Sequence, residues 1–100
     1  MNSSVRKLLT IITESVLERT LAEEIEHLGA RGFTVTDVRG KGSHGPRSAA
    51  WQESSNIRIE VVCDEPTAGA IAAHLQAHYY RNYGMILFMS DVAVLRPEKF

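Results

Sequence analysis

The sequence predicts an α+β domain in which two helices cover one face of a four-stranded antiparallel sheet. Four segments rich in apolar and β-branched residues alternate with two of helical periodicity, in the order strand, helix, strand, strand, helix, strand. That order is the split βαβ, or ferredoxin-like, arrangement. One hundred residues, 44% of them hydrophobic and 23% charged, are typical of a single globular domain spanning residues 1–100.

The first half of the chain predicts a strand followed by an amphipathic helix. Residues 5–12 place apolar side chains on both alternating faces, as in a strand covered on both sides. Residues 14–28 predict the helix, with Ser15 and Glu18 at the spacing of a capping box and Gly29 as a left-handed stop. The apolar positions of this helix recur at steps of four, four and three, at Leu17, Leu21, Ile25 and Leu28.

The second half predicts the remaining strands and a second helix. Segments 33–39 and 56–63 are rich in residues that favour strands. A helix is expected to begin near Pro66, because Asp64 complements the positive end of a helix and Pro in the first turn loses no hydrogen bond. Its apolar positions are Ala68, Ile71, Ala72, Leu75 and Tyr79, and it is expected to end by Asn82. Residues 85–95 form the last predicted strand.

This arrangement leaves one face of the sheet without helices. Alternate apolar residues of every strand point to that face, and a monomer would expose them to water. We therefore expect a homo-oligomer that packs these faces together, most simply as a closed ring.

Charge and cysteine content exclude several classes of protein. Eleven Lys and Arg against 12 acids give a net charge of -1, so no overall positive field favours nucleic acid. Cys63 is the single cysteine, and its position on an apolar strand face predicts a small core residue. No apolar run approaches the ~20 residues that cross a bilayer, and the N-terminus lacks a signal-peptide pattern. We expect a cytoplasmic protein that does not insert into a membrane.

Residues 39–47, with the sequence RGKGSHGPR, form the strongest candidate binding segment. Residues 38–52 contain three basic and no acidic residues, a charge of +3 against -4 for the rest of the chain. Glycines let successive backbone N–H groups turn toward one centre, while Lys, Arg and Ser add charge and a hydroxyl, which is typical of phosphate and small oxyanion sites. The alternative is a plain hairpin tip, but hairpin loops usually have about two to five residues.

Other candidate sites are weaker. His74 and His78 lie four residues apart in the second helix and could share a metal, but no third ligand is spaced to join them, so we expect two solvated histidines. Trp51 in the long loop indicates either a partner contact or a packed hinge. No nucleophile–base pair is visible, and no carboxylate pair lies beside the basic segment. We therefore expect neither an enzyme nor a metal site.

Much of the chain resembles the PII-like signalling proteins. The resemblance runs through residues 29–48, 56–75 and 79–95. Its specific element is G-F-T-V at 32–35, followed by G-K-G-S at 40–43 and by Arg47. The carboxysome-associated and bicarbonate-transporter-linked members are the most similar, and the ending RPEKF, without the Cys- and Gly-containing tail of many transporter-linked members, favours the carboxysome-associated branch.

The resemblance implies a homotrimer with adenine nucleotides in the clefts between subunits and a loop at about 40–55, the T-loop, that orders around the ligand. It implies that the phosphates are held by Gly40, Lys41, Gly42, Ser43 and Arg47, with Thr34 and Val35 near the ligand. The adenine pocket would be completed from the neighbouring subunit by Tyr83, Gly84, Met85 and Ile86. Bicarbonate, a planar anion that Arg can clamp, would be held by Lys41, Ser43, His44 and Arg47.

These implications describe a non-enzymatic sensor of ADP or AMP, with bicarbonate, that signals energy and inorganic carbon status to a carboxysome or bicarbonate-transporter protein. ATP is expected to bind less well, because a second glycine-rich segment with a Lys, which wraps the triphosphate in ordinary PII proteins, is missing. The alternative is a CutA-type trimeric metal-binding protein of the same fold, with His74 and His78 as ligands. A slow nucleotide hydrolase is disfavoured, because no carboxylates accompany the basic segment.

Overall fold

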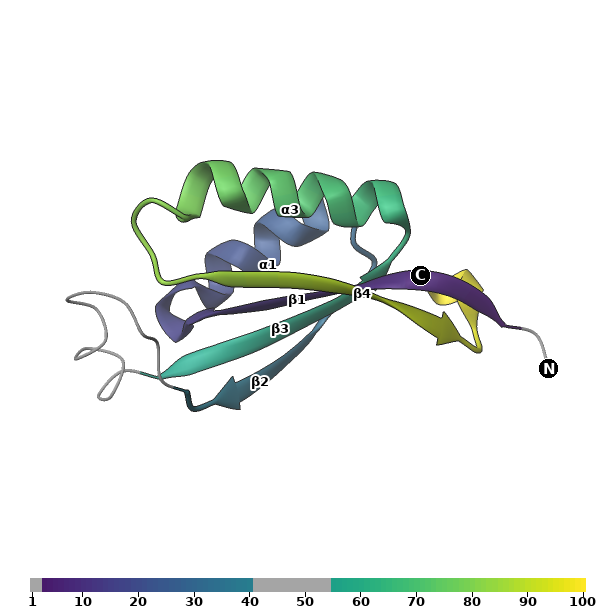
Figure 1. Cartoon of the computed structure of the whole chain (residues 1–100), viewed down its shortest axis with the longest axis horizontal. Coiled ribbons are helices and arrows are strands. Elements are labelled where there is room, and N and C mark those ends of the chain that lie inside the picture. The colour runs from purple at the N-terminus through teal and green to yellow at the C-terminus, as the bar shows by residue number, and fades with distance from the viewer. Residues whose placement is uncertain (1–2, 41–54) are drawn as a thin grey trace.

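The computed structural model describes residues 3–40 and 55–100 and contains the predicted elements in the predicted order (Figure 1). The strands are β1 (Ser4–Glu14), β2 (Thr34–Val38), β3 (Asn56–Cys63) and β4 (Ile86–Val94), and the helices are α1 (Glu18–His27) and α3 (Glu65–Tyr79). Two 3₁₀ helices, η1 (Ser15–Leu17) and η2 (Pro97–Lys99), follow β1 and β4. Among the helices of these two ranges, none is long and apolar enough to cross a membrane.

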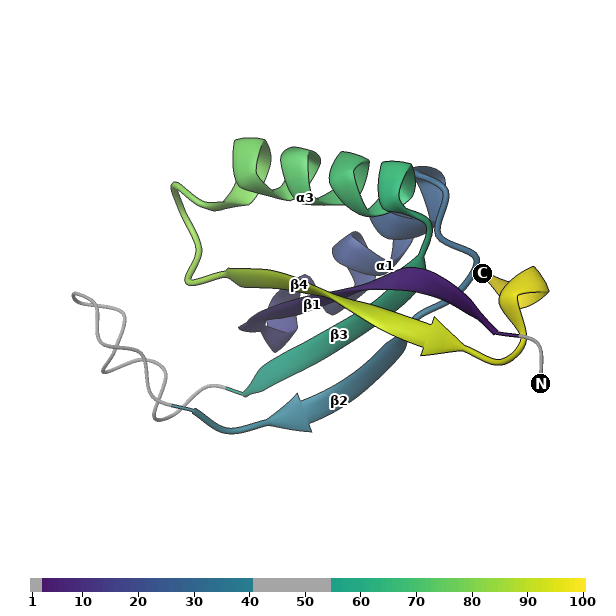
Figure 2. The same ribbon diagram turned by 45° about the vertical axis from the view of Figure 1, so that its right-hand side comes forward.

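The four strands form one antiparallel sheet in the order β2-β3-β1-β4. Both helices lie on the same face of this sheet, and no helix of the described residues lies on the opposite face (Figure 1 and Figure 2). The ferredoxin-like prediction is confirmed. The sheet order places β2 and β4 at opposite edges, with β1 and β3 between them.

The helix boundaries confirm one predicted start signal and contradict the other. The Asp64 side chain accepts a hydrogen bond from the Thr67 N–H at 2.9 Å and caps α3. The predicted capping box of Ser15 and Glu18 does not form, because α1 begins only at Glu18 without a side-chain cap. The Ser15 hydroxyl lies instead 3.0 Å from that of Ser55. Gly29 has a φ of 117° and ends α1 as expected.

The core lies between the helices and the sheet. Its largest fully buried side chains are Leu9, Ile11, Leu21, Ile25, Ile57, Ile59, Val61, Ile71 and Leu75. Cys63 is also buried here, which confirms that it is a core residue, and burial raises the pKa of its thiol.

The open face of the sheet, the one without described helices, carries apolar side chains that residues 3–40 and 55–100 do not cover. Leu8 pairs with Val62, and Thr10 with Phe88, so these residues share a face. Phe88 is 52% exposed and Ile86 48% exposed. An isolated subunit would leave this apolar surface in water.

We expect Leu75→Ala to lower the free energy of unfolding by about 2–5 kcal/mol, because Leu75 is fully buried between α3 and the sheet. Urea denaturation followed by circular dichroism measures the change. Val16→Ala is the control, since Val16 is 78% exposed and surface changes usually cost less than about 0.5 kcal/mol. Equal losses in both variants would contradict the assigned core.

Candidate functional site

The basic segment predicted to bind phosphate leaves the sheet at the end of β2. Gly40 is the last described residue before it, two residues beyond Val38, and it is exposed. Five of the predicted ligand residues and Trp51 lie outside the described residues: Lys41, Gly42, Ser43, His44 and Arg47. Their roles remain predictions.

Thr34, at the opposite end of β2, lines a surface pocket of about 320 Å³. The remaining lining residues come from the turn before β2, from β3 and from the C-terminal turn: Arg31, Gly32, Phe33, Glu60, Val62, Lys99 and Phe100. Thr34 pairs with Glu60 across the β2–β3 ladder, so both side chains project from the open face. We call this cavity the Thr34 pocket.

The Thr34 pocket combines cationic, aromatic and acidic groups. The Arg31 guanidinium donates a hydrogen bond of 2.7 Å to the carbonyl oxygen of Glu98, which holds the C-terminal turn against the pocket. Phe100 supplies an apolar ring surface, and the carboxylate of Glu60 can accept hydrogen bonds. Phe33 also borders the pocket, but its side chain packs against the core. Such a pocket suits a ligand that has a flat ring, donor groups and a negative charge.

The other predicted β2 residue points away from this pocket. Val35 pairs with Ile59 and packs against the core on the helix side of the sheet. Its side chain is therefore separated from Thr34 by the sheet itself, as expected for neighbours in a strand. Only its backbone is left near the open face.

The predicted adenine-binding residues form the turn between α3 and β4. The N–H of Gly84 donates to the Glu14 carboxylate at 3.1 Å, and the N–H of Met85 donates to the carbonyl of Tyr83 at 2.9 Å. Met85 is buried, whereas Ile86 projects onto the open face. Hydrogen bonds and burial thus fix the course of this turn.

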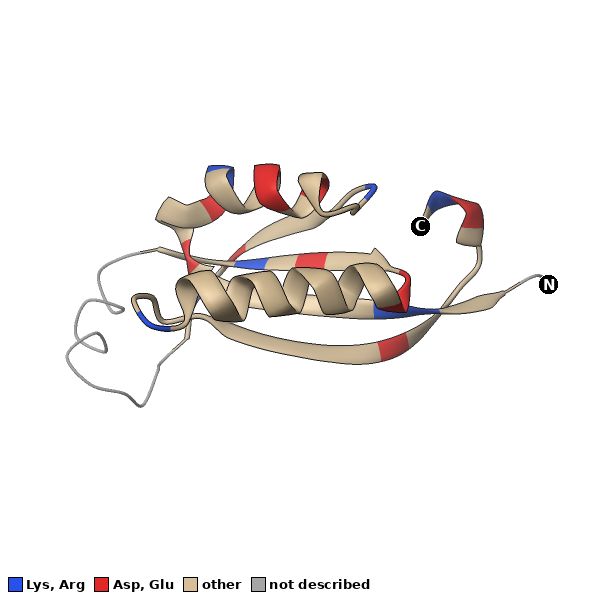
Figure 3. Ribbon diagram, turned by 90° about the horizontal axis from the view of Figure 1, so that it is seen from above, with Lys and Arg blue, Asp and Glu red and all other residues tan. Residues whose placement is uncertain are grey.

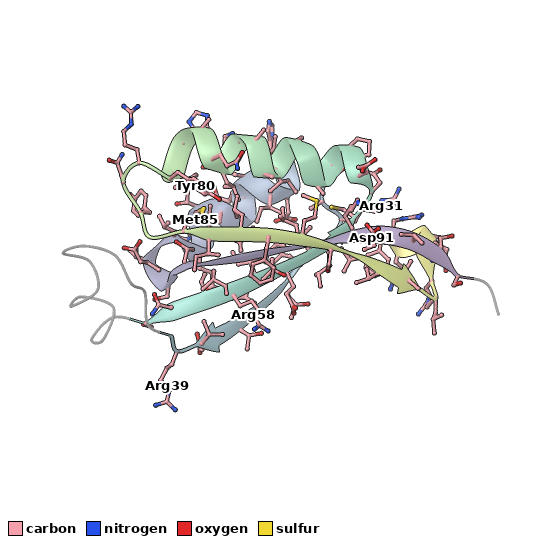
Figure 4. All side chains as sticks on the ribbon, viewed as in Figure 1. Arg31, Arg39, Arg58, Tyr80, Met85 and Asp91 are labelled. Carbon is pink, nitrogen blue, oxygen red and sulfur yellow. The ribbon has the colours of Figure 1, made fainter. Side chains whose placement is uncertain are left out.

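The register shows which predicted residues a single chain brings together. Thr36, Arg58, Ile12 and Ile86 form one row across the sheet. The 83–86 turn and Gly40 therefore lie at the same end of the sheet but at opposite edges. The three strand spacings between β2 and β4 separate these edges by about 14 Å. The Thr34 pocket lies at the other end of β2. Figure 4 shows this separation in Arg39, which follows β2, and Arg31, which lines the pocket.

The sequence predicted Thr34 as a ligand residue but did not predict the other residues that line its pocket. Arg31 precedes the predicted motif. The pattern around Glu60 indicates only the polar side of a strand, and the residues of the C-terminal turn have the composition of a polar tail. The alternation in residues 56–63 did indicate that Glu60 projects away from the core, which was the one available signal.

A second polar cluster joins the two helices. The Nε2–H of His74 donates to Glu24 Oε1 at 2.7 Å, and the Tyr79 hydroxyl donates to Glu24 Oε2 at 2.7 Å. The His78 ring lies against that of His74, with centroids 4.3 Å apart. His74 is thus half-buried and bonded, contrary to the expectation of two solvated histidines, while His78 is exposed. Burial, together with the Glu24 carboxylate, raises the pKa of Tyr79 to about 12.

The sequence profile of the family Nitrogen regulatory protein P-II matches residues 6–99. A PII-like signalling protein from Thermus thermophilus has a similar structure, with 43% sequence identity and a TM-score of 0.85 over 100% of this chain and 99% of that one.

Two structures of CPII from Thiomonas intermedia are also similar. The one bound to ADP, AMP and acetate is 25% identical, with a TM-score of 0.86 over 100% of this chain and 98% of that one. The one bound to ADP and bicarbonate is 26% identical, with a TM-score of 0.84 over 99% and 97%.

We expect one tyrosine to ionise near pH 12 in the folded protein, because Tyr79 is buried beside a carboxylate. Its pKa is raised on folding, so its contribution to stability is complete below about pH 10 and is lost as the pH rises toward 12. Ultraviolet titration should show this late ionisation, and Tyr79→Phe should remove it. Tyr80→Phe is the control, since Tyr80 is exposed. Loss of the late ionisation in Tyr80→Phe instead would contradict the assignment.

Proposed function

Because the chain belongs to the P-II family of nitrogen regulatory proteins, we propose that it is a regulatory, non-enzymatic sensor of ADP or AMP. The observation that carries the proposal is the Thr34 pocket, which contains a residue predicted for nucleotide binding. The structures of CPII bound to ADP, AMP and acetate and to ADP and bicarbonate, at 25% and 26% identity, support adenine nucleotides as the ligand class.

The Thr34 pocket has the groups that an adenine nucleotide needs. Phe100 offers a surface for the base, and the carboxylate of Glu60 can accept a hydrogen bond from its exocyclic amine. Guanine presents an oxygen at that position, so Glu60 would repel it. Arg31 uses one of its five N–H donors on Glu98 and keeps others for phosphate, and Lys99 adds a second positive charge.

The complete site is proposed to form between two subunits of a homotrimer. The Thr34 pocket opens on the same face of the sheet as Phe88 and Ile86, the face that needs a covering partner. Thr34 and Gly40 lie at opposite ends of β2, so one phosphate group cannot contact both in a single chain.

We therefore propose that the Thr34 pocket of one subunit meets the segment 40–47 and the 83–86 turn of its neighbour. This division differs from the sequence-based expectation, which assigned Thr34 and Gly40 to the same subunit and the 83–86 turn to the other. The sheet register supports it, because Gly40 and the 83–86 turn lie at one end of the sheet and Thr34 lies at the other end of β2.

Bicarbonate is the proposed co-ligand. Lys41, Ser43, His44 and Arg47 are the residues predicted for it, and a guanidinium can hold a planar anion with two hydrogen bonds. The signal would report energy and inorganic carbon status in the cytoplasm through residues 40–55, where Trp51 lies, to a carboxysome or bicarbonate-transporter protein. The CutA alternative loses support, because the family profile that matches is that of P-II.

We expect micromolar binding of ADP and AMP in isothermal titration calorimetry, repeated with and without bicarbonate. Arg47→Ala should weaken ADP binding about 10- to 100-fold, because a charge-assisted hydrogen bond contributes about 1.5–3 kcal/mol. Glu60→Gln should weaken it as well. Arg19→Ala, an exposed change on α1, is the control. Unchanged affinity in Arg47→Ala would remove the proposed phosphate clamp, and failure of the wild type to bind either nucleotide would overturn the proposed function.

The trimer gives a separate prediction. Light scattering coupled to gel filtration should give the mass of three 11.1 kDa chains, about 33 kDa. Phe88→Glu should shift the protein toward monomer, because it places a charge on the open face. Val16→Glu adds the same charge at an exposed position outside the sheet and should remain trimeric. A wild-type monomer would contradict the proposed assembly.

A further inference from the structure

A groove of about 300 Å³ lies between α1 and α3, in the helical layer and away from the open face of the sheet. It is lined by Glu23, Glu24, His27, Leu28 and His74. Figure 3 shows the contrast between the two helices that border it, because α1 carries several acidic residues whereas most of α3 carries none. We propose that this groove binds one transition-metal ion of the Zn²⁺ type, a site independent of the proposed nucleotide cleft.

The first two ligands already face each other across the groove. His74 Nε2 and Glu24 Oε1 are 2.7 Å apart, joined by one proton. Two donors of a tetrahedral zinc ion, with Zn–N and Zn–O bonds near 2.0–2.1 Å, are about 3.3 Å apart. The metal can therefore replace that proton if the two atoms separate by about 0.6 Å. The metal-bound neutral imidazole carries its single hydrogen on Nδ1, so the hydrogen on Nε2 moves to Nδ1 in a neutral ring or leaves to solvent from a doubly protonated one.

The third and fourth ligands come from the exposed rim of α1. His27 lies three residues after Glu24 and four after Glu23, so all three side chains share one side of the helix. His27 and Glu23 are exposed and can rotate toward the ion. Among the residues that the structure describes, no three such groups already converge on one point, so metal binding requires this rotation.

Tyr79 positions the carboxylate for this role. Its hydroxyl donates to Glu24 Oε2 and leaves Oε1 directed at His74. Hydrogen bonds to a ligating carboxylate from outside the coordination sphere orient metal ligands in the same way. Tyr79 itself is 8% exposed, so the bond is held by the core of the protein.

The donor types select the class of metal. Imidazole nitrogens with carboxylate oxygens suit Zn²⁺, Co²⁺ and Ni²⁺, whereas Mg²⁺ and Ca²⁺ take oxygen ligands. The sequence-based expectation of no metal rested on the lack of a third ligand near His74 in the chain. The fold supplies that ligand from α1, about 50 residues away.

The test uses the full-length oligomer without a polyhistidine tag. Zn²⁺ titration calorimetry should show one ion per chain, and Co²⁺ should give the intense visible absorption of tetrahedral coordination. His27→Ala and His74→Asn should each weaken Zn²⁺ binding by roughly tenfold or more. His27 is exposed, so its variant is expected to remain folded even if His74→Asn is not.

Two control variants separate this groove from other histidines and acids. Glu26→Gln removes a carboxylate from the same helix outside the groove, and His44→Ala removes the histidine of the basic segment; both should bind Zn²⁺ as the wild type does. Failure of the wild type to bind Zn²⁺, unchanged binding in His27→Ala, or equal loss in Glu26→Gln would each overturn the proposal. ADP affinity measured in His27→Ala should match the wild type, which keeps this result distinct from the proposed sensor function.

Discussion

The two helices cover one face of the four-stranded sheet. The other face exposes apolar side chains, and this exposed surface is the constraint on which the proposed assembly depends. Leu8, Val62 and Phe88 lie on that face, and the described part of the chain places no layer over it. Each Å² of apolar surface removed from water stabilises an assembly by about 25 cal/mol. The Thr34 pocket opens on the same face, so a subunit that covered this face in the proposed oligomer would also lie near the pocket.

Local chemistry explains how much of the fold was predictable. The helical spacing of Leu21 and Ile25, and the cap that Asp64 provides, act within one or two turns of chain, so the sequence displays them directly. The predicted cap at Ser15 failed for a complementary reason. The Ser15 hydroxyl forms a hydrogen bond with that of Ser55, 40 residues away, and the sequence around Ser15 does not predict that contact.

The same distinction separates the parts of the candidate site. Thr34 belongs to a contiguous motif and was predicted from it. Its pocket is made by strand pairing with Glu60 and by a hydrogen bond from Arg31 to Glu98, 67 residues apart, and neither contact has a local signal. Likewise, the histidines of α3 looked solvated because the carboxylate that binds His74 comes from another helix.

The pairing of Val38 with Asn56 fixes the two points between which the basic segment runs. Once a hairpin is clamped at its base, the entropy lost in closing it rises slowly with length, by only about 0.6 kcal/mol per doubling. Evolution can therefore lengthen, shorten or change that segment while the sheet and the helices stay as they are. Changes in this segment can therefore alter what the protein recognises with little loss in the folding stability of the domain.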